Sequence, residues 1–509
     1  MSNYKKKICS LEEVIRKIKN SRKKNFLIGL SHGVFDLLHL GHVTHFNEAK
    51  KKVDILIASV TSDQHVSKGP GRPFFNQAQR MEMISNLETV DYVVLSESDS
   101  SLGVIKSVKP NIYFKGPDYK DNSKDFTKKI IEENNLVKRI GGATYYTSSK
   151  KYSSTNLLQK FQFVKKNDSV TIKKIKKNFS FDKIKELIDD LHKIKPLVLG
   201  ETIIDQYVFC EALGKSGKEP TLVLRDLSEE FYLGGAGAIA NHLSSFCKKT
   251  FFLTFLGQNK DKIKFIKKNI KSGINLNYIE KKESPTIIKK RYLDNISKHK
   301  LLGVYTLNDK MISHQENKSL SKKFLKINKI TDLTILSDYG HGFIGKKFAQ
   351  EVIKKSRFIS VNAQINASNF GHHSLDGYKN VNFMIINESE LRHEMRERDV
   401  NVFSLAKKLS KKLNIKYLAV TRGSEGAILY YNRKNLFYNT VAYADTVIDK
   451  VGAGDAMLSI LSLCLFKKID IDLSLLIASF CAVQSVKTIG NKSSLNKLNL
   501  LKDIFHFLA

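Results

Sequence analysis

The chain has 509 residues, 42% hydrophobic and 27% charged, a size that exceeds one hydrophobic core and suggests about two to four domains. No stretch reaches the roughly 18 uncharged apolar residues that a membrane span needs. The first residues lack the apolar core of a signal peptide. The five cysteines lie far apart without C-x-x-C spacing, which argues against zinc sites and disulfide frameworks. We therefore expect a protein of the reducing cytoplasm with no membrane contact.

The formal net charge is +35, which raises the question of nucleic-acid binding. A nucleic-acid binder concentrates its basic residues on one face and interleaves aromatic side chains. Here lysine is spread along the whole chain together with many Asn and Ile residues, and there is no Trp. We interpret the charge as compositional drift on solvated faces. The sequence predicts no nucleic-acid partner and some attraction for phosphorylated substrates.

The first predicted elements lead into a turn that carries histidines. Ser10 and Glu13 form a capping box that opens an amphipathic helix, and residues 26–30 are typical of a buried parallel strand. The stretch Gly33–His42, GVFDLLHLGH, comes next and precedes a predicted helix over 42–51. A glycine-bearing turn between strand and helix binds phosphate through free amides, and two imidazoles three residues apart can donate hydrogen bonds to it. The simpler alternative is that one histidine caps the turn and the other faces solvent.

Three further motifs follow in order. The loop Lys68–Pro73 carries two cations and is interpreted either as a phosphate grip or as a plain solvated loop. Arg80 opens a predicted amphipathic helix, to which we assign no role in a site. A short predicted strand over 111–114 ends in Lys115–Tyr119. Ser153–Asn156 precedes a helix-like segment, where hydroxyls serve either as an N-cap or as phosphate ligands.

Together the four motifs resemble the nucleotidyltransferase domain of ADP-heptose synthesis proteins, in the superfamily with the H-x-G-H signature. Members of that branch join a nucleoside triphosphate to a phosphorylated alcohol and release pyrophosphate. This chain departs from close relatives at Val34, where they usually have Cys, and at His32, which borders the site and stands in place of Asn. The resemblance implies that His39 and His42 stabilise the triphosphate in the transition state and that Lys68 and Lys115 bind its phosphates. It implies that Ser154 and Thr155 bind the pyrophosphate end and that Asp36 and Asp118 position the nucleotide or sugar. The other implied residues of the nucleotide site are Gly33, Phe35, Gly41, Arg72 and Ser153.

The chemistry that this resemblance implies needs no protein nucleophile. An oxygen of the substrate's own phosphate attacks the α-phosphorus in line, so the protein supplies position and positive charge. A Mg²⁺ ion on the triphosphate is the implied cofactor. The nucleotide is expected to be ATP, with CTP as the alternative.

The second half of the chain carries its own glycine-rich signals. Residues 164–179 form a basic stretch with little pattern and are the predicted linker, after which Ser180 caps an amphipathic helix. The strongest stretch is Asp449–Asp455, DKVGAGD, before an apolar run. Small residues there let the backbone approach an anion, and Asp455 can take the proton of an attacking hydroxyl. The alternative is a glycine turn with an N-cap Asp; a second glycine-rich helix entry at Gly234–Asn241 argues against it.

These two stretches resemble the ribokinase-like, PfkB-type carbohydrate kinases, which carry an early G-G-x-x-x-N-A-type motif and a late D-T-x-G-A-G-D. Asp338–Gly342 is close to the D-Y-x-K-G of heptose-phosphate kinases, whereas Lys450 replaces the usual Thr and Glu201 replaces an Asp. The resemblance implies Asp455 as catalytic base, Gly452, Ala453 and Gly454 as phosphate-binding residues, Thr421, Gly423 and Gly426 as the ATP site, Asn387 and Glu390 as organisers of Mg²⁺ and phosphate through water, and Asp205, Gly234, Gly235, Asn241 and Asp449 as sugar-binding residues.

The sequence therefore predicts an α/β protein with two doubly wound domains: a Rossmann-like nucleotidyltransferase over 1–163 and a ribokinase-like sugar kinase over 180–509. The predicted function is nucleotide-sugar synthesis, in which the kinase phosphorylates a heptose 7-phosphate-like sugar phosphate and the transferase makes an ADP-sugar. The alternative is a CTP-dependent transferase fused to a kinase for another sugar or polyol. A non-enzymatic sugar sensor or scaffold is the third hypothesis, and the retention of the chemistry-bearing residues argues against it. The kinase comes first in the usual bifunctional heptose protein, so the order here is reversed. We expect a homodimer that acts on sugar phosphates and nucleoside triphosphates.

Overall fold

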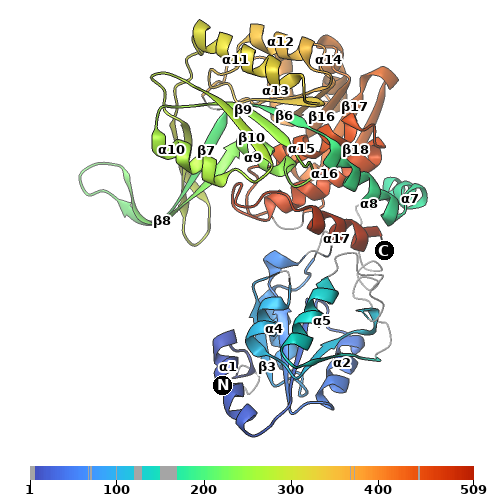
Figure 1. Ribbon diagram of the computed structural model, residues 1–509. Helices are drawn as coiled ribbons and strands as arrows, with labels where there is room; N and C mark the ends of the chain where they lie inside the picture. The colour runs from blue at the N-terminus through green and yellow to red at the C-terminus, as the bar shows by residue number, and fades with distance from the viewer. Residues whose placement is uncertain are drawn as a thin grey trace. The chain divides into compact units, whose positions relative to one another are not determined.

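The computed structural model describes residues 6–66, 68, 72–98, 100–119, 129–148, 169–366, 368–371, 373–444 and 447–508. Internal contacts divide the chain into two compact units (Figure 1). Unit 1 comprises Met1–Val164 together with Lys502–Ala509, and unit 2 comprises Lys165–Leu501. The C-terminal residues thus group with unit 1 rather than with the predicted kinase domain.

Unit 1 is built on a five-stranded parallel sheet in the order β3-β2-β1-β4-β5. Along β2, Ile55 and Ile57 belong to one apolar cluster and Leu56 and Ala58 to another, so both faces of the sheet are buried. Helices α1, α4 and α5 cover the first face, and α2 and α3 cover the second. The strands are β1 (Ile28–Gly33), β2 (Ile55–Thr61), β3 (Tyr92–Ser96), β4 (Ile112–Lys115) and β5 (Ala143–Tyr146); the helices are α1 (Leu11–Lys23), α2 (Leu40–Lys50), α3 (Gln77–Ser85), α4 (Leu102–Val108) and α5 (Lys129–Arg139).

Local sequence signals place most of these elements. The predicted capping box of Ser10 and Glu13 is present at the start of α1. The strand predicted over 26–30 begins later, at Ile28, where the parallel pairing with β2 starts, and the two apolar side chains before it are 43% and 45% exposed. The helix predicted from Arg80 begins three residues earlier, because Asn76 caps it.

The predicted linker contains an ordered helix, which corrects the expectation of a patternless segment. Helix α7 (Ser169–Asn178) buries Ile175 and pairs Lys174 with Asp472. Only one face of this short helix is buried, so its apolar repeat is short and is hard to recognise among the frequent lysines.

Unit 2 contains a nine-stranded sheet in the order β10-β9-β6-β13-β14-β15-β16-β17-β18. Its pairs are parallel except for the two that involve β17. One large apolar cluster packs α11, α12 and α14 onto the sheet (Figure 1). The strands are β6 (Pro196–Gly200), β9 (Thr250–Leu256), β10 (Ile274–Glu280), β13 (Leu333–Asp338), β14 (Ile359–Ala363), β15 (Phe383–Asn387), β16 (Tyr417–Thr421), β17 (Ala427–Tyr431) and β18 (Leu436–Thr440).

A second sheet has four strands in the order β12-β11-β7-β8 and is called the lid below. Strands β7 and β8 pair as a long antiparallel hairpin whose far end reaches away from the body of the unit (Figure 1). The lid strands are β7 (Thr202–Lys215), β8 (Leu222–Gly235), β11 (Ile287–Asp294) and β12 (Lys300–Thr306); the longer helices of the unit are α8 (Phe181–Asp190), α9 (Ala236–Leu243), α10 (Lys260–Asn269), α11 (His314–Asn328), α12 (Lys346–Lys355), α13 (Glu388–Met395), α14 (Val402–Lys412), α15 (Ala453–Phe466) and α16 (Ile471–Val486), and α17 (Lys497–Leu508) closes the chain.

Helices α15 and α16 are apolar on nearly every side and are buried almost throughout. Such helices belong inside a domain, because a surface helix would show a polar face. Together the two sheets confirm the predicted α/β class. No described helix has the length and apolar character needed to cross a membrane.

The buried position of α15 generates a stability prediction. Replacing Leu461, which is fully buried, by alanine is expected to lower the free energy of unfolding of unit 2 by about 2–5 kcal/mol. The control Leu436→Ala, at a half-exposed position, is expected to cost less than about 1 kcal/mol. Urea denaturation followed by circular dichroism measures both; equal costs would contradict the placement of α15.

Candidate functional site

The turn between β1 and α2 holds two stacked imidazoles. The rings of His39 and His42 lie 3.9 Å apart between centroids and are nearly parallel. The backbone N–H of Gly41 donates to Nδ1 of His39 at 3.1 Å, and the N–H of His39 approaches Nδ1 of His42 at 3.4 Å. Because each Nδ1 accepts, each neutral ring carries its proton on Nε2. The simpler alternative therefore holds for His39, which caps the helix, but His42 is half-buried rather than solvent-facing.

Burial keeps these imidazoles neutral at pH 7. It lowers the pKa of His42 to about 3, with the nearby His39, Lys68 and His45 adding to the effect. Burial also lowers the pKa of His39, again with a contribution from Lys68. Neutral imidazoles that carry an Nε2–H are suited to donating hydrogen bonds to phosphate oxygens.

Phe35 packs against the ring of His42. Its backbone has a φ of +51°, and its ring meets the rings of His42 and Phe46 at centroid distances of 5.6 and 5.1 Å. A Cβ atom at Gly33 would lie 3.1 Å from the Phe35 ring, so the glycine leaves this ring its space. The motif thus fixes the orientation of His42 through an aromatic contact.

Four cations gather near this turn, and three of them are paired with carboxylates. Lys68 makes no hydrogen bond or ion pair within the described part of the chain. Burial lowers the pKa of Lys68 to about 8, and the charges of the other three cations lower it too, although Asp36 opposes them. The ion pairs are Arg72 with Asp36 at 2.6 Å, Arg80 with Asp63 at 2.6 Å, and Lys115 with Glu133 at 2.9 Å.

Asp36 is buried among protein groups. Besides pairing with Arg72, its carboxylate accepts backbone N–H donors from Phe74 at 2.8 Å and from Phe75 at 3.1 Å. These contacts hold the segment after the Lys68–Pro73 loop against the turn. The direct nucleotide or sugar contact of Asp36 stays a prediction.

Arg80 is a site residue that the sequence did not reveal. It is fully buried, and its guanidinium donates to the carbonyl oxygens of Val34 at 2.6 Å, Thr61 at 2.8 Å and Phe75 at 3.0 Å. It therefore joins the three loops that frame the site. An available signal was its place beside Met81 on the apolar stripe of α3, where an arginine requires partners.

Two further histidines are buried nearby, His32 on β1 and His45 on α2. His32 contacts hydroxyls of β2, with Nδ1 3.0 Å from Ser59 Oγ and Nε2 3.4 Å from Thr61 Oγ1. His45 lies 2.7 Å from Ser31 Oγ and 2.9 Å from Thr147 Oγ1. Burial lowers the pKa of each to about 4. His32 thus substitutes for the usual Asn by bridging two strands, and His45 was missed.

Several predicted residues of unit 1 cannot be placed. Ser153, Ser154 and Thr155 lie outside the described residues, and so does the side chain of Asp118. Their roles stay predictions.

In unit 2, the start of α15 carries the predicted base. Gly452 precedes the helix with a φ of +90°, and a Cβ atom there would lie 2.5 Å from the side-chain oxygen of Asn491. The hydroxyl of Tyr339 donates to Oδ1 of Asp455 at 3.1 Å. Burial raises the pKa of Asp455 to about 7, the hydrogen bond from Tyr339 opposes the shift, and Asp205 adds to it. Asp455 is therefore poised as a base near neutral pH.

The lid brings two cations to the same end. Arg291 pairs with Asp205 at 2.5 Å, and Lys289 is the register partner of Asp205 across the parallel pair β7–β11. A Cβ atom at Gly234 would lie 2.1 Å from Oδ2 of Asp205, so this glycine makes room for the carboxylate. Burial lowers the pKa of Lys289 to about 8, although Asp205 favours the charged form. Sequence reasoning missed both cations; their i, i+2 spacing on one strand face was the signal.

Glu201, a departure from the resembled family, fixes the turn that carries Tyr339. Its two carboxylate oxygens accept backbone N–H donors from Tyr339 at 2.8 Å and from His341 at 3.1 Å. Burial raises the pKa of Glu201 to about 8, and the neighbouring Asp338 adds to the shift. The longer side chain thus positions the partner of Asp455.

Asn387 and Glu390 form a capping box at the start of α13. Oε2 of Glu390 accepts from the N–H of Asn387 at 2.8 Å, and Oε1 accepts from Ile365 at 3.3 Å. Burial raises the pKa of Glu390 to about 7, and the charge of Asp455 adds to the shift. Asn387 is the register partner of Thr421 on β16, so the structure joins these two predicted motifs.

Glycines shape the hairpin between β16 and β17. Gly423 and Gly426 have φ angles of +55° and +85°, and a Cβ atom at Gly426 would lie 2.0 Å from the carbonyl oxygen of Thr440. These positions favour glycine because side chains rarely adopt that backbone conformation.

Three predicted sugar-site residues have structural contacts. Asp449 accepts from the Tyr207 hydroxyl at 2.9 Å and pairs with Lys300 at 2.7 Å, which secures the segment before α15. Asn241 donates to the carbonyl oxygen of Asn269 at 3.0 Å and accepts from a backbone N–H, so it fastens the turn after α10. Gly235 caps α9 with a φ of +58°. Lys450 and Gly454 are exposed.

The described residues contain no group of three or more His, Cys, Asp or Glu side chains that could hold a metal ion. Each Glu390 oxygen retains a second lone pair that can accept a hydrogen bond from water; a contact to Mg²⁺ through that water stays a prediction.

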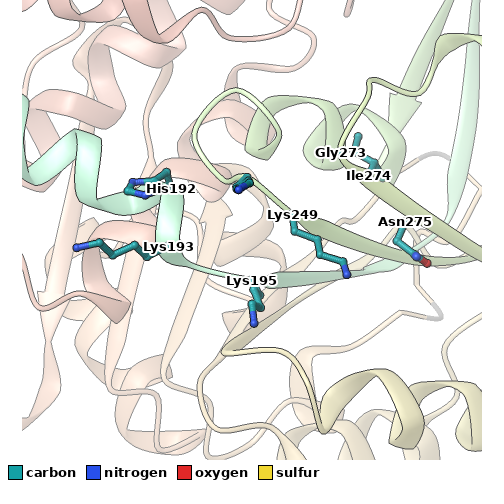
Figure 2. A pocket seen from close by; sticks show the side chains of 8 residues that line it. His192, Lys193, Lys195, Lys249, Gly273, Ile274 and Asn275 are labelled. Atoms are coloured by element: carbon teal, nitrogen blue, oxygen red, sulfur yellow. The ribbon is translucent and has the colours of Figure 1, made fainter.

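A basic hollow of about 680 Å³ lies elsewhere in unit 2 (Figure 2). It adjoins the amino ends of β6, β9 and β10, whereas the groups around Asp338 and Asn387 follow the carboxyl ends of their strands. Parallel α/β sheets bind substrates at carboxyl ends, so the hollow is separate from the candidate site. Its lining consists of His192, Lys193, Lys195, Lys248, Lys249, Gly273, Ile274 and Asn275.

More than half of the chain, residues 193–498, matches the family described as pfkB family carbohydrate kinase. The chain belongs to this family. The preceding segment, residues 30–160, matches the family described as cytidylyltransferase-like. The order along the chain is therefore a cytidylyltransferase-like segment followed by a PfkB-type kinase segment, which confirms the predicted resemblance.

Curated relatives include two proteins named bifunctional protein HldE. That of Campylobacter fetus subsp. fetus is 34% identical over 163 residues, 32% of this chain and 32% of that protein. That of Nitratiruptor sp. is 44% identical over 115 residues, 22% of this chain and 25% of that protein. The chain thus matches between about a quarter and a third of the length of these relatives.

Solved structures agree with the fold of unit 2. Phosphofructokinase-2 from Escherichia coli, in complex with potassium, has a TM-score of 0.50 at 14% identity and covers 62% of this chain and 99% of its own. A putative ribokinase from Agrobacterium tumefaciens has a TM-score of 0.50 at 13% identity, with coverages of 62% and 99%. At such identities these structures show the fold alone.

The hydrogen bond between Tyr339 and Asp455 generates a pH prediction for the PfkB-type unit. An ionised base is required, so phosphoryl transfer is expected to fall as pH falls through about 7. Tyr339→Phe removes a donor that lowers the pKa of Asp455, and the acid limb should therefore move to higher pH by roughly 0.5 to 1 unit. Rate–pH profiles measure the shift. Tyr305→Phe, at a more exposed tyrosine, is the control, and an unmoved limb in Tyr339→Phe would contradict the assignment.

Proposed function

We propose that the chain is a bifunctional enzyme of nucleotide-sugar synthesis. Unit 2 transfers the γ-phosphoryl group of ATP to a sugar phosphate, and unit 1 joins a nucleotide to a sugar 1-phosphate with release of pyrophosphate. The observation that carries the proposal is the grouping of Asp455 with Lys289 and Arg291 at one end of the lid. In this arrangement Asp455 can accept the proton of a sugar hydroxyl, and the two cations can bind a phosphate group on the same sugar.

In the kinase step, Asp455 takes the proton of the attacking sugar hydroxyl. The hydrogen bond from Tyr339 orients the carboxylate towards that hydroxyl. The first backbone amides of α15, after Gly452, have no partners within the helix and stabilise the negative charge of the transferred phosphoryl group. Mg²⁺, when bound to ATP, neutralises phosphate charge, and Glu390 would hold it through water.

In the transferase step, an oxygen of the sugar 1-phosphate attacks the α-phosphorus, and the bond from that phosphorus to the pyrophosphate oxygen breaks. His39 and His42 present Nε2–H donors to the phosphates, since their Nδ1 atoms accept from the backbone. Lys68 has no carboxylate partner among the described residues and supplies positive charge to the leaving group. No group of the protein becomes covalently attached.

We propose ATP as the nucleotide and a heptose 7-phosphate-like sugar as the kinase substrate, with an ADP-sugar as the product. The support is the set of four motifs that resembles the ADP-heptose proteins. A CTP-dependent transferase with a kinase for another sugar or polyol is the alternative. We place the enzyme in the cytoplasm, where five free, buried cysteines stay reduced.

Two variants test the assignment of the two activities. Asp455→Asn is expected to abolish phosphoryl transfer and leave pyrophosphate release unchanged, because the bases and cations of the two sites are different groups. His42→Ala is expected to lower pyrophosphate release by about 100-fold or more and leave phosphoryl transfer unchanged. Pyrophosphate release is measured with ATP or CTP and heptose 1-phosphate, and phosphoryl transfer with ATP and heptose 7-phosphate.

Three outcomes would change the proposal. Release with CTP alone would favour the alternative nucleotide. Loss of both activities in either variant would contradict independent sites. Absence of both activities in the unchanged chain, across a panel of sugar phosphates, would favour a sensor or scaffold.

We also propose a homodimer that forms through the lid. Strand β12 is exposed along its whole length and carries apolar side chains that a second copy would cover, namely Leu301, Leu302, Val304 and Tyr305. Light scattering on the unchanged chain is expected to give a dimer mass, and Leu302→Glu a monomer mass. A monomeric unchanged chain would contradict the proposal; Leu436→Glu, outside the lid, is the control.

A further inference from the structure

Lys115 and Glu133 form a buried ion pair at the carboxyl end of β4. Nζ of Lys115 lies 2.9 Å from Oε2 of Glu133, and the two side chains are 9% and 6% exposed. Lys115 is the last residue of β4, whereas Glu133 belongs to α5. The pair therefore joins two elements at the end of the sheet where the His39–His42 turn lies.

Both partners are held by further groups. The ammonium of Lys115 lies 5.1 Å from the ring centre of Tyr113 and 4.8 Å from that of Tyr119. The Tyr113 hydroxyl donates towards Oε2 of Glu133 at 3.0 Å and lies 2.9 Å from Oγ of Ser101. One carboxylate and two rings thus fix the position of the ammonium, which has three donors and uses one for Glu133.

Lys68 provides an internal comparison for Lys115. The charge of Lys115 contributes to the lowered pKa of Lys68, so the two lysines are near enough to compare. Burial lowers the pKa of Lys68, which has no carboxylate partner in the described residues. Burial alone would lower the pKa of Lys115 too, but Tyr113, Glu133 and Tyr119 together raise it. The carboxylate is the ionised one of these three partners at neutral pH, because burial raises the pKa of Tyr113 to a range where it stays neutral and Lys115 lowers the pKa of Glu133.

We propose that Glu133 is a positioning residue of the transferase site, which keeps Lys115 protonated and fixed where a nucleoside triphosphate binds. The inference rests on the proposed transferase function. Glu133 acts through Lys115 and does not contact the nucleotide. With Glu133 in place, Lys115 stays protonated whether or not the nucleotide is bound. The protonation of Lys68, by contrast, depends on whether an anionic ligand is bound. The titratable and charged groups that face Lys115 are Tyr113, Tyr119 and Glu133, together with His32 on β1, His45 on α2 and Lys68.

The decisive experiment is a pH profile of the full chain with Glu133→Gln. Glutamine keeps the shape and still accepts a hydrogen bond from Lys115, but the ammonium loses its compensating charge. If the pKa of Lys115 then falls near that of Lys68, about 8, kcat/KM for the nucleotide at pH 9 should drop about 10-fold relative to the unchanged chain. At pH 6.5 the ratio should stay near one. Each value is compared with that of the unchanged chain at the same pH, because deprotonation of Lys68 lowers the activity of the unchanged chain at alkaline pH as well.

A second change separates positioning from a merely structural role. Arginine stays charged at all these pH values, so Lys115→Arg in the Glu133→Gln background is expected to restore most of the activity at pH 9. Glu132→Gln, at an exposed neighbour on the same helix, is the matched control and should leave the profile unchanged. Phosphoryl-transfer activity shows that unit 2 of each preparation is folded, and an unchanged rate of pyrophosphate release at pH 6.5 shows that unit 1 is folded. A loss in Glu133→Gln that is equal at every pH, or is not rescued by arginine, would overturn the inference.

Equilibrium binding of ATP and CTP, measured by calorimetry at pH 6.5 and 9, separates this inference from the proposed function. Unit 2 is itself proposed to bind ATP, so a second ATP site or a CTP site reports unit 1. If the unchanged chain has such a site but releases no pyrophosphate, the proposed transferase reaction fails, and weaker binding at that site by Glu133→Gln at pH 9 alone would still support the role of Glu133. If the chain binds neither nucleotide, both proposals fail. If both variant and unchanged chain bind with the same pH dependence, the role of Glu133 alone fails.

Discussion

The cost of burying charge is the constraint on which both sites depend. Each site lies where parallel strands end, and each gathers several charged groups with little access to water. Removing an ion from water is expensive unless a partner of opposite charge lies close. Arg72, Arg80 and Lys115 meet this requirement through carboxylates, and Arg291 meets it through Asp205. Lys68 and Lys289 have no carboxylate ion pair among the described residues, and burial lowers the pKa of each.

The same constraint gives the two units a common design. In unit 1 the turn before α2 carries neutral imidazoles, and in unit 2 the turn before α15 carries a carboxyl group with a pKa near 7. In both, the side chain lies at a helix start, and burial sets its protonation state. Lys68 and Lys289 correspond in this respect, since burial lowers the pKa of each to about 8. Binding of phosphate would stabilise their charged forms.

The sequence predicted the architecture well, because its signals are local. The capping box at Ser10 needs only a neighbour three residues away, and the strands that end at Gly33 and Lys115 are recognisable as apolar runs. Glycine motifs likewise report backbone conformation, as Gly426 shows with its φ of +85°. The same locality produced the errors: the linker concealed α7 because its apolar repeat was diluted by lysine.

What the sequence determined by itself is the chemistry of the groups: imidazoles in one turn, an acidic residue behind glycines in another, and the order of two α/β units. Only the tertiary structure decided which charges meet. Glu133 lies 2.9 Å from Lys115, Lys289 stands beside Asp205, and Asp36 turns inward to Arg72. These pairs come from different elements, and the free energy of an ion pair depends on distance and burial, neither of which sequence spacing specifies across a sheet. The structure therefore assigned the roles that the residue types alone left open.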